Sequence, residues 1–451
     1  MRQPYPHYRN SLVERIGEVP RHWDVWRMKV VASINDENFS DNEDPLHNMS
    51  YIDIGSVDAI DGITKVEQLV FEDAPTRARR LVREGDTIVS TVRTYLRAIA
   101  PVIEPPDDLV VSTGFAVVRP FGMDEGYCSW VLREYGFVEE IVACSVGVSY
   151  PAINASELGL FQITVPPLDE QHAIAAFLDH ETGRIDNLLN KNQILLERLA
   201  EYCTALISQT VTKGLPPDAA LAAGTDPSPR LKSSEVEWIG DIPEHWEVQR
   251  IKNVAAMNPS KSELRTTVTD ETSVVFLPME NVEADGKIDQ SEIRSVDEVW
   301  EGYTYFRKED VLVAKITPCF ENGKGAYLNS LLTDVGFGST EFHVLRAGPS
   351  VLPSFLYHVT ASQAFRAQGT HAMTGAAGQK RVPSLFVEHF SIPVPPIEEQ
   401  RAIVAFLEGE TNRIDSLTNR VQTAIERLQE YRTALITAAV TGKIDVRDLA
   451  S

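Results

Sequence analysis

The chain has few cysteines and no membrane-length apolar run. Its 451 residues include only Cys128, Cys144, Cys203 and Cys319, which are scattered and form no Cys-x-x-Cys pair. This spacing offers neither a disulfide framework nor a set of zinc ligands, and we expect reduced thiols. No apolar run approaches the roughly 18 residues of a membrane span, and the residues after Met1 do not resemble a secretory signal. The sequence therefore predicts a cytoplasmic protein that does not enter a membrane.

Basic residues are also scarce. The sequence contains 42 lysines and arginines against 65 aspartates and glutamates, which gives a formal net charge of −23. A protein that neutralises many phosphates needs a matching number of cations. The balance argues against a chain that wraps nucleic acid by bulk electrostatics, so any contact with DNA must come from a few local basic loops.

Motifs for catalysis are missing. There is no GxxxxGK[ST] phosphate loop, because the stretch 375–380 has the wrong spacing, and there is no GxGxxG or HExxH. A methyltransferase motif of the Asn-Pro-Pro-Tyr type is absent, since the related stretch reads Asn258-Pro259-Ser260. Asp310 and Lys315 are close in sequence, but a complete nuclease set of two carboxylates and a lysine is not evident. We therefore predict no catalytic residue, no metal site and no cofactor bound by this chain.

The chain does contain one long sequence twice. Residues 166–213 return as residues 395–442, and more than half of the aligned positions are identical. A shorter repeat precedes each copy, because Ile16–Trp23 returns as Ile239–Trp246. We interpret the Pro-x-His-Trp histidine of each short repeat as structural rather than as a ligand. The protein is thus two half-molecules in tandem, which suits a target with two equivalent parts.

The repeat divides the chain into five segments. We predict a leading segment and a mixed α/β domain over 1–165, a helical segment over 166–213, an exposed linker over 214–232, a second leading segment and domain over 233–394, and a second helical segment over 395–445. The two domains differ in sequence between shared landmarks. A shared scaffold with different contents is what two related binding sites with different ligands would show.

The landmarks lie at equivalent places in the two domains. Arg83-Glu84-Gly85-Asp86 matches Arg307-Lys308-Glu309-Asp310, and each is followed by a short β-rich run. Further along, Arg119 matches Arg346. We therefore expect the two domains to share a fold.

Apolar residues in the repeated segments recur at heptad spacing, which predicts two long helices packed as a coiled coil. The sequence has Asn192 where the second copy has Val421, and a polar seam residue commonly fixes register. A helix from Ile185 to Val211 rises about 40 Å, near one turn of B-DNA, and could set the distance between two sites on a duplex. One predicted seam position holds Leu178, Ile185, Leu199, Leu206, Leu407, Ile414, Leu428 and Leu435; the other holds Leu188, Leu195, Tyr202, Leu417, Ala424 and Tyr431.

These residues together resemble one known family. Both copies begin Pro-Pro-x-x-Glu-Gln and continue through Arg184-Ile185-Asp186 or Arg413-Ile414-Asp415 to Glu-Arg-Leu-x-Glu-Tyr, and both leading segments carry Pro-x-His-Trp. The combination covers essentially the whole chain and is specific, although each element alone is weak. The chain resembles the specificity subunit of type I restriction–modification systems.

The resemblance implies a fold and a set of partners. The fold is α+β: two mixed α/β target-recognition domains joined by two long antiparallel coiled-coil helices, as a pseudo-twofold tandem repeat. Each domain would read one half of a bipartite, asymmetric sequence in double-stranded DNA. The helices would recruit two methyltransferase subunits, which bind S-adenosylmethionine and methylate adenine. Two restriction subunits that use ATP and Mg can join. This chain would catalyse nothing, in the cytoplasm of a bacterium or an archaeon.

Loops that follow the β-rich runs are the expected DNA-contacting segments, because direct readout needs side chains that reach base edges while cations contact phosphates. The cluster at 77–83 has a solvated helix face as its alternative interpretation. The Gly-rich loop at 374–381 suits a close backbone approach to phosphate. The predicted DNA-binding residues are Arg77, Arg79, Arg80, Arg93, Thr94, Tyr95, Arg97, Ser149, Tyr150, Lys315, Thr317, Asn322, Lys324, Thr374, Gln379, Lys380 and Arg381.

Other functions stay open on the sequence alone. One is the recognition subunit of a different restriction or phage-defence assembly. Another is an acidic scaffold that mimics DNA, which the net charge of −23 would suit. The two divergent domains argue against the scaffold, because a DNA mimic does not need two domains with different sequences. For a specificity subunit, we expect most of the nonspecific DNA affinity to come from the methyltransferase partners.

Overall fold

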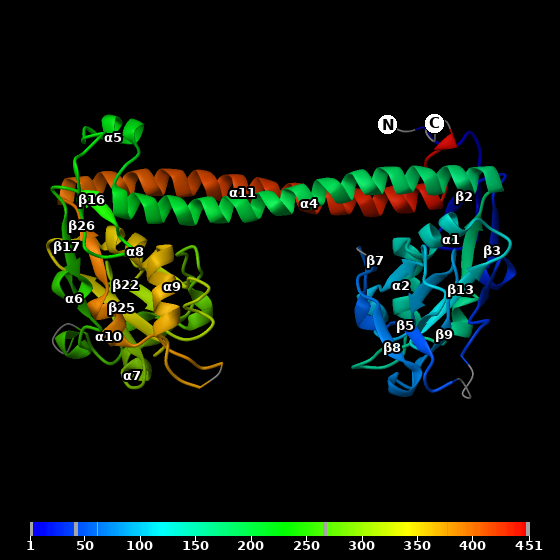
Figure 1. Cartoon of the computed structure of the whole chain (residues 1–451), viewed down its shortest axis with the longest axis horizontal. Coiled ribbons are helices and arrows are strands. Elements are labelled where there is room, and N and C mark those ends of the chain that lie inside the picture. Colours follow the sequence, from blue (N-terminus) through cyan, green and yellow to red (C-terminus); the bar gives the residue numbers. More distant parts are fainter. Residues whose placement is uncertain (1–2, 40–43, 61, 265–267, 377, 448–451) are drawn as a thin grey trace. The chain divides into compact units, whose positions relative to one another are not determined.

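The computed structural model describes residues 3–39, 44–60, 62–264, 268–376 and 378–447. It divides into two compact units, which are residues 1–192 with 422–451, and residues 193–421. The two long helices, α4 (Leu168–Lys213) and α11 (Ile397–Val440), each contribute one part to each unit. Within a unit the two helix segments run antiparallel (Figure 1). Each unit therefore takes in part of both predicted helical segments.

Among the described residues, the first unit contains two four-stranded sheets. One is antiparallel throughout, in the order β11-β10-β13-β4. The other has the order β8-β5-β12-β9, in which β5 and β12 run parallel. Their strands are β4 (Ala32–Ile34), β5 (Asn48–Ile52), β8 (Glu67–Val70), β9 (Ala78–Leu81), β10 (Thr87–Ser90), β11 (Ile99–Pro101), β12 (Leu109–Ser112) and β13 (Phe115–Pro120).

The second unit repeats this topology strand for strand. Its described sheets have the orders β23-β22-β25-β18 and β20-β19-β24-β21, and the parallel pair is β19 with β24. The two sequence regions that differ most thus share one fold, as the landmarks predicted. The strands are β18 (Ala255–Met257), β19 (Ser273–Leu277), β20 (Ile293–Ser295), β21 (Thr304–Arg307), β22 (Val311–Ala314), β23 (Gly325–Tyr327), β24 (Val335–Gly338) and β25 (Phe342–Ala347).

Most shorter elements also have a counterpart in the other unit, although the short strands at 57–58 and 62–63 correspond only to an isolated bridge between Val282 and Ile288. In the first unit they are β1 (Tyr8–Asn10), β2 (Glu18–Pro20), β3 (Asp24–Arg27), β6 (Val57–Asp58), β7 (Gly62–Ile63), β14 (Gln162–Val165), α1 (Glu125–Leu132), α2 (Tyr135–Cys144) and α3 (Ala155–Leu158). In the second they are β15 (Leu231–Ser233), β16 (Asp241–Pro243), β17 (Glu247–Arg250), β26 (Ser391–Val394), α6 (Ile251–Val254), α7 (Val296–Val299), α8 (Pro353–Ala361), α9 (Gln363–Ala372) and α10 (Ser384–His389). The segment predicted as a linker contains a short helix, α5 (Pro217–Ala223), which starts at a proline and ends at Gly224.

The landmark residues form the same buried ion pair in each unit. The Arg119 guanidinium donates two hydrogen bonds to the Asp86 carboxylate, at 2.8 and 2.7 Å. Arg346 makes the same pair of bonds to Asp310, both at 2.8 Å. Hydrogen bonding to Asp86 raises the pKa of Arg119. The repeated aspartate and arginine therefore join the start of β10 or β22 to the neighbouring strand β13 or β25 of the same sheet, and Asp310 is part of this scaffold.

The residues that recur between the leading segments and the long helices form a second shared structure. Glu170, in the first turn of α4, accepts hydrogen bonds from Trp23 Nε1 at 2.8 Å and pairs with His22 Nε2 at 2.7 Å. Glu399 pairs with His245 at 2.8 Å in the same way. These contacts support the structural interpretation of both histidines. The repeated Pro-x-His-Trp and Glu-Gln motifs join the leading segment to the start of each helix.

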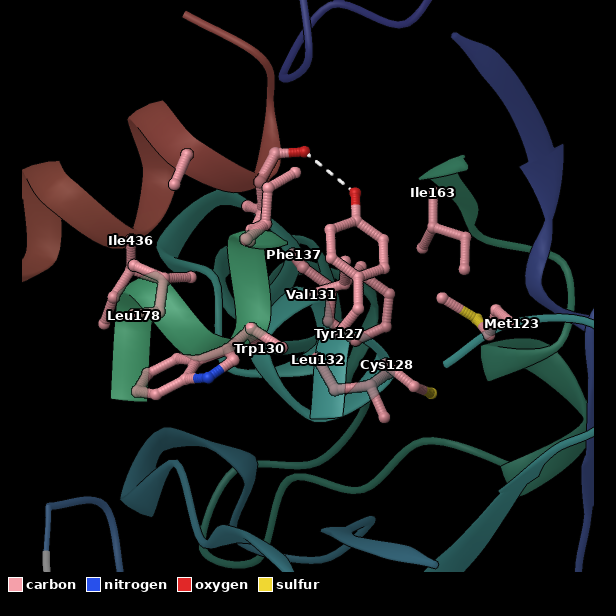
Figure 2. Close-up of a cluster of buried hydrophobic side chains, with 14 of the residues drawn as sticks. Met123, Tyr127, Cys128, Trp130, Val131, Leu132, Phe137, Ile163, Leu178 and Ile436 are labelled. Carbon is pink, nitrogen blue, oxygen red and sulfur yellow. Dashed lines mark hydrogen bonds between the residues drawn. The ribbon is translucent and has the colours of Figure 1, made fainter. Parts of the chain in front are cut away.

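The core of the first unit includes the last turns of α11. Figure 2 shows Tyr127, Phe137 and Trp130 of α1 and α2 packed with Leu178 of α4 and Ile436 of α11. The Tyr127 hydroxyl donates to the Val440 carbonyl at 3.2 Å. Residues about three hundred positions apart in the sequence thus lie in one buried cluster.

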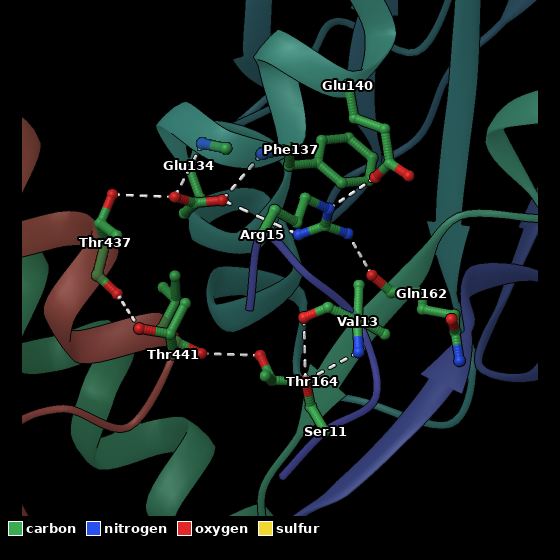
Figure 3. Close-up of polar contacts among 12 residues, drawn as sticks. Ser11, Val13, Arg15, Glu134, Phe137, Glu140, Gln162, Thr164, Thr437 and Thr441 are labelled. Atoms are coloured by element: carbon green, nitrogen blue, oxygen red, sulfur yellow. Dashed lines mark hydrogen bonds and ion pairs between the residues drawn. The ribbon is translucent and has the colours of Figure 1, made fainter. Parts of the chain in front are cut away.

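Polar contacts tie α11 to the same unit. Figure 3 shows Glu134, whose carboxylate accepts from the amides of Gly136 and Phe137 at the start of α2, each at 2.8 Å. The Thr437 hydroxyl donates to Glu134 Oε1, which also accepts from the Gly136 amide, again at 2.8 Å. The same carboxylate thus caps α2 and binds α11, which ties the end of α11 to the first unit.

The structure corrects the prediction that both seam positions of the long helices are buried. Leu178, Ile185 and Leu206 are buried, as are Leu407, Ile414 and Leu435. At the second seam position, the exposed residues are Leu188, Leu195, Tyr202, Leu417 and Tyr431. Heptad spacing places residues on one side of a helix, but the helix segments also pack against the α/β domain, which selects one stripe. Asn192 donates to the Leu188 carbonyl of its own helix at 2.8 Å, so its amide makes no cross-helix register contact in this structure.

Candidate nucleic-acid interface

A pair of loops forms the end of the antiparallel sheet in the first unit. Val92, just after β10, bridges to Ala152, which also bridges to Val146. The Arg93 amide donates to the Pro151 carbonyl at 2.8 Å. These backbone bonds bring the loop after β10 against the 146–152 segment, which we call the first tip loop.

The second unit builds the same pair of loops. Ile316, just after β22, bridges to Arg381, which also bridges to Thr374. The Thr317 amide donates to the Lys380 carbonyl at 2.9 Å. We call 374–381 the second tip loop; its Ala377 lies outside the described residues. Figure 1 shows this loop, in orange, reaching beyond the body of its unit.

Both tip loops turn at an equivalent glycine. Gly147 has φ +125 and Gly375 has φ +127. A Cβ on Gly147 would lie 3.1 Å from the Tyr150 carbonyl oxygen, and one on Gly375 would lie 2.9 Å from the Gln379 carbonyl oxygen. Only glycine fits such a backbone without strain. The sequence prediction that these two loops correspond is therefore confirmed.

The predicted residues around the first tip loop differ in their exposure and in whether another side chain already binds them. Arg93 is exposed and its guanidinium lies 4.5 Å from the centre of the Tyr150 ring. Arg97 forms an ion pair with Glu139. Thr94 is buried and its hydroxyl bonds to Ser145 at 2.8 Å, so it does not reach solvent. Tyr95 and Ser149 are exposed.

The arginine cluster at 77–83 lies on strand β9 and its flanks, not on a helix face. Arg77 pairs with Asp53 at 3.1 Å, and Arg79 lies over the Phe71 ring at 4.9 Å. Arg80 donates to the Asn38 side chain at 3.1 Å, and burial lowers its pKa. Arg83 pairs with Glu37. The cluster is engaged within the unit, which makes it a weaker DNA candidate than its density in the sequence suggested.

Around the second tip loop, the exposed predicted residues are polar. Arg381 forms a two-pronged pair with Glu341, at 2.7 and 2.9 Å, and this bonding lowers the pKa of Glu341. The Thr317 hydroxyl contacts Met373 Sδ, and Lys324 donates to the Met279 carbonyl at 3.2 Å. The exposed predicted residues are Asn322, Thr374, Gln379, Lys380 and Arg381.

Lys315 borders a cavity that the sequence did not indicate. The cavity has a volume of about 320 Å³ and is also lined by Lys261, Tyr303 and Asn258. Among the described residues, the Lys315 ammonium has no hydrogen-bond or ion-pair partner. The lining residues are separated by dozens of positions, so no local pattern could have predicted this basic hollow beside the second tip loop.

No group of three His, Cys, Asp or Glu side chains in the described part of the chain could hold a metal ion. No helix among the described residues is long and apolar enough to cross a membrane.

The fold defines a protein made of two like-folded modules, each ending in a paired-loop tip with its own side chains. A comparison with protein families matches residues 86–198 and 243–427 to the family described as type I restriction modification DNA specificity domain. The chain belongs to this family.

Several individual proteins are similar to the chain. The specificity subunit of the Escherichia coli type I restriction enzyme EcoEI is 36% identical over 260 residues, which cover 57% of this chain and 41% of that protein. The EcoAI specificity subunit of the same species is 33% identical over the same shares. The match thus spans less than half the length of these relatives. A putative MjaX specificity subunit of Methanocaldococcus jannaschii is 23% identical over 96% of each chain.

Solved structures share the fold. A chain from a study of complex assembly and conformational transition of the type I R-M system aligns with a TM-score of 0.71 and 22% identity, over 94% of this chain and 98% of that one. The HsdS subunit from Thermoanaerobacter tengcongensis aligns with a TM-score of 0.53 and 21% identity over the same shares. These likenesses support the predicted fold class.

Proposed function

We propose that the chain is a non-catalytic specificity subunit that binds a bipartite, asymmetric target in double-stranded DNA, with each unit reading one half. One observation carries the proposal: the two units have the same strand order and equivalent tip loops, yet the loops present different side chains. Protein side chains read base edges, while the scaffold only positions them. A shared scaffold with unlike tips therefore suits two unlike half-sites.

The proposed contacts are few, which fits the acidity of the chain. Among the described residues, the ammonium groups of Lys380 and Lys315 near the second tip have neither a carboxylate nor a hydrogen-bond partner, and we assign them to phosphates. Bulk affinity would come from the methyltransferase subunits of the assembly. Those subunits would carry S-adenosylmethionine, and restriction subunits, where they join, would carry ATP and Mg. The assembly would work in the cytoplasm, where the host DNA lies.

The proposed docking surface for the methyltransferase subunits lies on the long helices. In the first unit Leu188 and Tyr431 are 47% and 48% exposed. Their repeat equivalents in the second unit, Leu417 and Tyr202, are 39% and 53% exposed. Each unit thus carries the same apolar pair, one residue from each helix. Exposed aromatic and leucine side chains in equivalent places suit two copies of one partner.

Deleting the gene and mapping N6-methyladenine across the host genome tests the proposed function. We expect one bipartite, gapped motif to lose methylation, because no other chain would direct the methyltransferase to it. Restoring the gene on a plasmid should restore the motif and serves as the control. An unchanged methylation pattern, with the operon shown to be transcribed, would contradict the proposal.

Tyr202→Ala and Tyr431→Ala are each expected to remove one methyltransferase subunit from the complex. A buried interface tyrosine commonly contributes 2 kcal/mol or more, which is roughly a thirtyfold loss of affinity. Native mass spectrometry of the assembled complex measures the subunit count directly. The matched control is Arg198→Ala on α4, whose exposed side chain pairs with Glu201 at 2.7 Å. Retention of two subunits at limiting concentration in the double variant would exclude this surface.

A further inference from the structure

At the first tip, Arg93 contacts an aromatic ring but has no carboxylate to neutralise its charge. Arg93 is exposed, and its guanidinium stacks on the Tyr150 ring at 4.5 Å. Among the residues that the structure describes, no carboxylate lies within ion-pair distance of it. The chain has a net charge of −23, yet this exposed arginine at the tip has no acidic partner among the described residues.

Arg97 provides an internal comparison. Arg93 and Arg97 flank the same 3-10 turn (Thr94–Leu96), and both have a left-handed backbone, with φ of 53 and 55. Both guanidinium groups lie over a tyrosine, Tyr150 and Tyr135 respectively. Arg97, however, is paired with Glu139. The two arginines thus share a left-handed backbone and a tyrosine neighbour, but Arg97 is less exposed and its charge is already paired.

The strained backbone at Arg93 is held by the tip loop itself. A non-glycine residue with positive φ costs about 1 kcal/mol or more, and such residues are often found at functional sites. The Arg93 amide is bound to the Pro151 carbonyl, next to the tyrosine on which the side chain stacks. One loop thus contacts both the backbone and the guanidinium of Arg93, which reduces the entropy lost when the side chain binds a ligand.

We infer that Arg93 reads a guanine in the half-site of the first unit, with its guanidinium donating two hydrogen bonds to guanine O6 and N7. This inference rests on the proposed function and names the base that one tip recognises. An arginine stacked on an aromatic ring keeps the donors of its edge free, and the paired bond to O6 and N7 is the commonest specific contact of arginine with DNA.

The surroundings of Arg93 favour a base over a phosphate as its ligand. Val146 and Val148, in the same tip loop, are strongly exposed, and the loop contains no charged residue. Apolar side chains suit the groove floor, where they can contact a thymine methyl group, better than they suit the phosphate backbone. The equivalent position in the second unit is Thr317, whose hydroxyl contacts Met373, so the second tip lacks this contact.

The test uses the assembled complex with its methyltransferase subunits and a set of duplexes in which each base pair of the target is changed in turn. For the wild-type complex we expect methylation to fall when one G·C pair of the first half-site is replaced. For Arg93→Lys, which keeps the charge but loses the two-pronged geometry, we expect the preference for that pair to drop about tenfold to a hundredfold, with the other positions unchanged.

Two matched variants separate base reading from a structural role. Arg97→Lys should keep the wild-type sequence preference, because Arg97 is already paired with Glu139. Tyr150→Phe keeps the ring and should keep the guanine preference, whereas Tyr150→Ala should reduce it. Thermal unfolding of each variant checks that the first unit stays folded.

The failures of the two proposals are distinguishable. A wild-type complex with no bipartite preference would overturn the proposed function. A bipartite preference whose first half-site has no G·C requirement, or whose G·C requirement survives Arg93→Lys in a folded protein, would overturn the assignment of Arg93 alone. A uniform loss of methylation at every duplex would also overturn it, because that result identifies a phosphate contact.

Discussion

Replacing residues 28–161 with the matching segment of another family member is expected to change one half of the recognised sequence and to leave the other half intact. The joints lie at Arg27, the end of β3, and Gln162, the start of β14, which pair directly in the sheet. Outside the joints, the contacts of His22 and Trp23 with Glu170 remain. The graft therefore carries both loops of the first tip while the connection to α4 stays native.

The donor segment must keep two contacts with α11. Tyr127 binds the Val440 carbonyl, and Glu134 accepts from Thr437. A donor with a tyrosine and a glutamate at these places should fold onto the helices, because the core of this unit includes α11. Sequencing of N6-methyladenine in a host that lacks other adenine methyltransferases measures the new motif. A change in both halves would contradict the two-reader arrangement.

The reciprocal graft is the control for this prediction. Residues 251–390, between the end of β17 and the start of β26, can replace residues 28–161 of the same chain, since the two units share their strand orders. The graft carries Phe355→Tyr and Ser362→Glu, because these residues stand at the places of Tyr127 and Glu134. Two copies of one domain should give a target whose halves carry the same base sequence. Retention of the original asymmetric target would show that the tips do not determine sequence.

Changing Asp86 to alanine is expected to destabilise the first unit by about 3 kcal/mol, because the largely buried Arg119 guanidinium loses its two-pronged partner and keeps only the Glu37 carboxylate at 3.4 Å. Asp86 is 1% exposed and binds Arg119 through two hydrogen bonds. It also accepts a bond from the Arg83 amide at 2.8 Å, which would be lost as well. Urea unfolding followed by far-ultraviolet circular dichroism measures the change, and Asp310→Ala should produce the same effect in the second unit.

An exposed ion pair serves as the control for the Asp86 variant. Lys65 and Glu67 lie in the same unit, with side chains 65% and 41% exposed. Removal of a surface partner changes stability by roughly 0–1 kcal/mol, because water solvates the remaining charge. We therefore expect Glu67→Ala to unfold almost like the wild type. A cost below about 1 kcal/mol for Asp86→Ala would mean that the pair is not a structural requirement.

The fold was largely predictable because its signals are local and repeated. The tandem copies, the heptad spacing and the short β-rich runs each depend on residues within a few turns of one another. The correspondence of the two tip loops was also visible, through Gly147 and Gly375 and the landmarks before them. The element most clearly missed was the short helix α5, which has too few residues to show a period.

The DNA-contacting residues were predictable only as a set of candidates. Residue type and position near a strand end selected seventeen side chains, but Thr94 is buried and Arg381 is bound to Glu341. Arg93 and Arg97 are indistinguishable in the sequence, although only one has a carboxylate partner in the structure. Such partners come from distant parts of the chain, and no local pattern encodes them.

By itself, the sequence determined that this protein is a tandem repeat with two long helices, with no visible catalytic motif and with too few cations to bind DNA by charge alone. Those properties follow from composition and periodicity, which are fixed along the chain. Only the tertiary structure decided which helix stripe is buried, which carboxylate neutralises which arginine, and which arginine is left to bind. Burial and ion pairing depend on groups brought together from separate elements, so they exist only once the chain has folded.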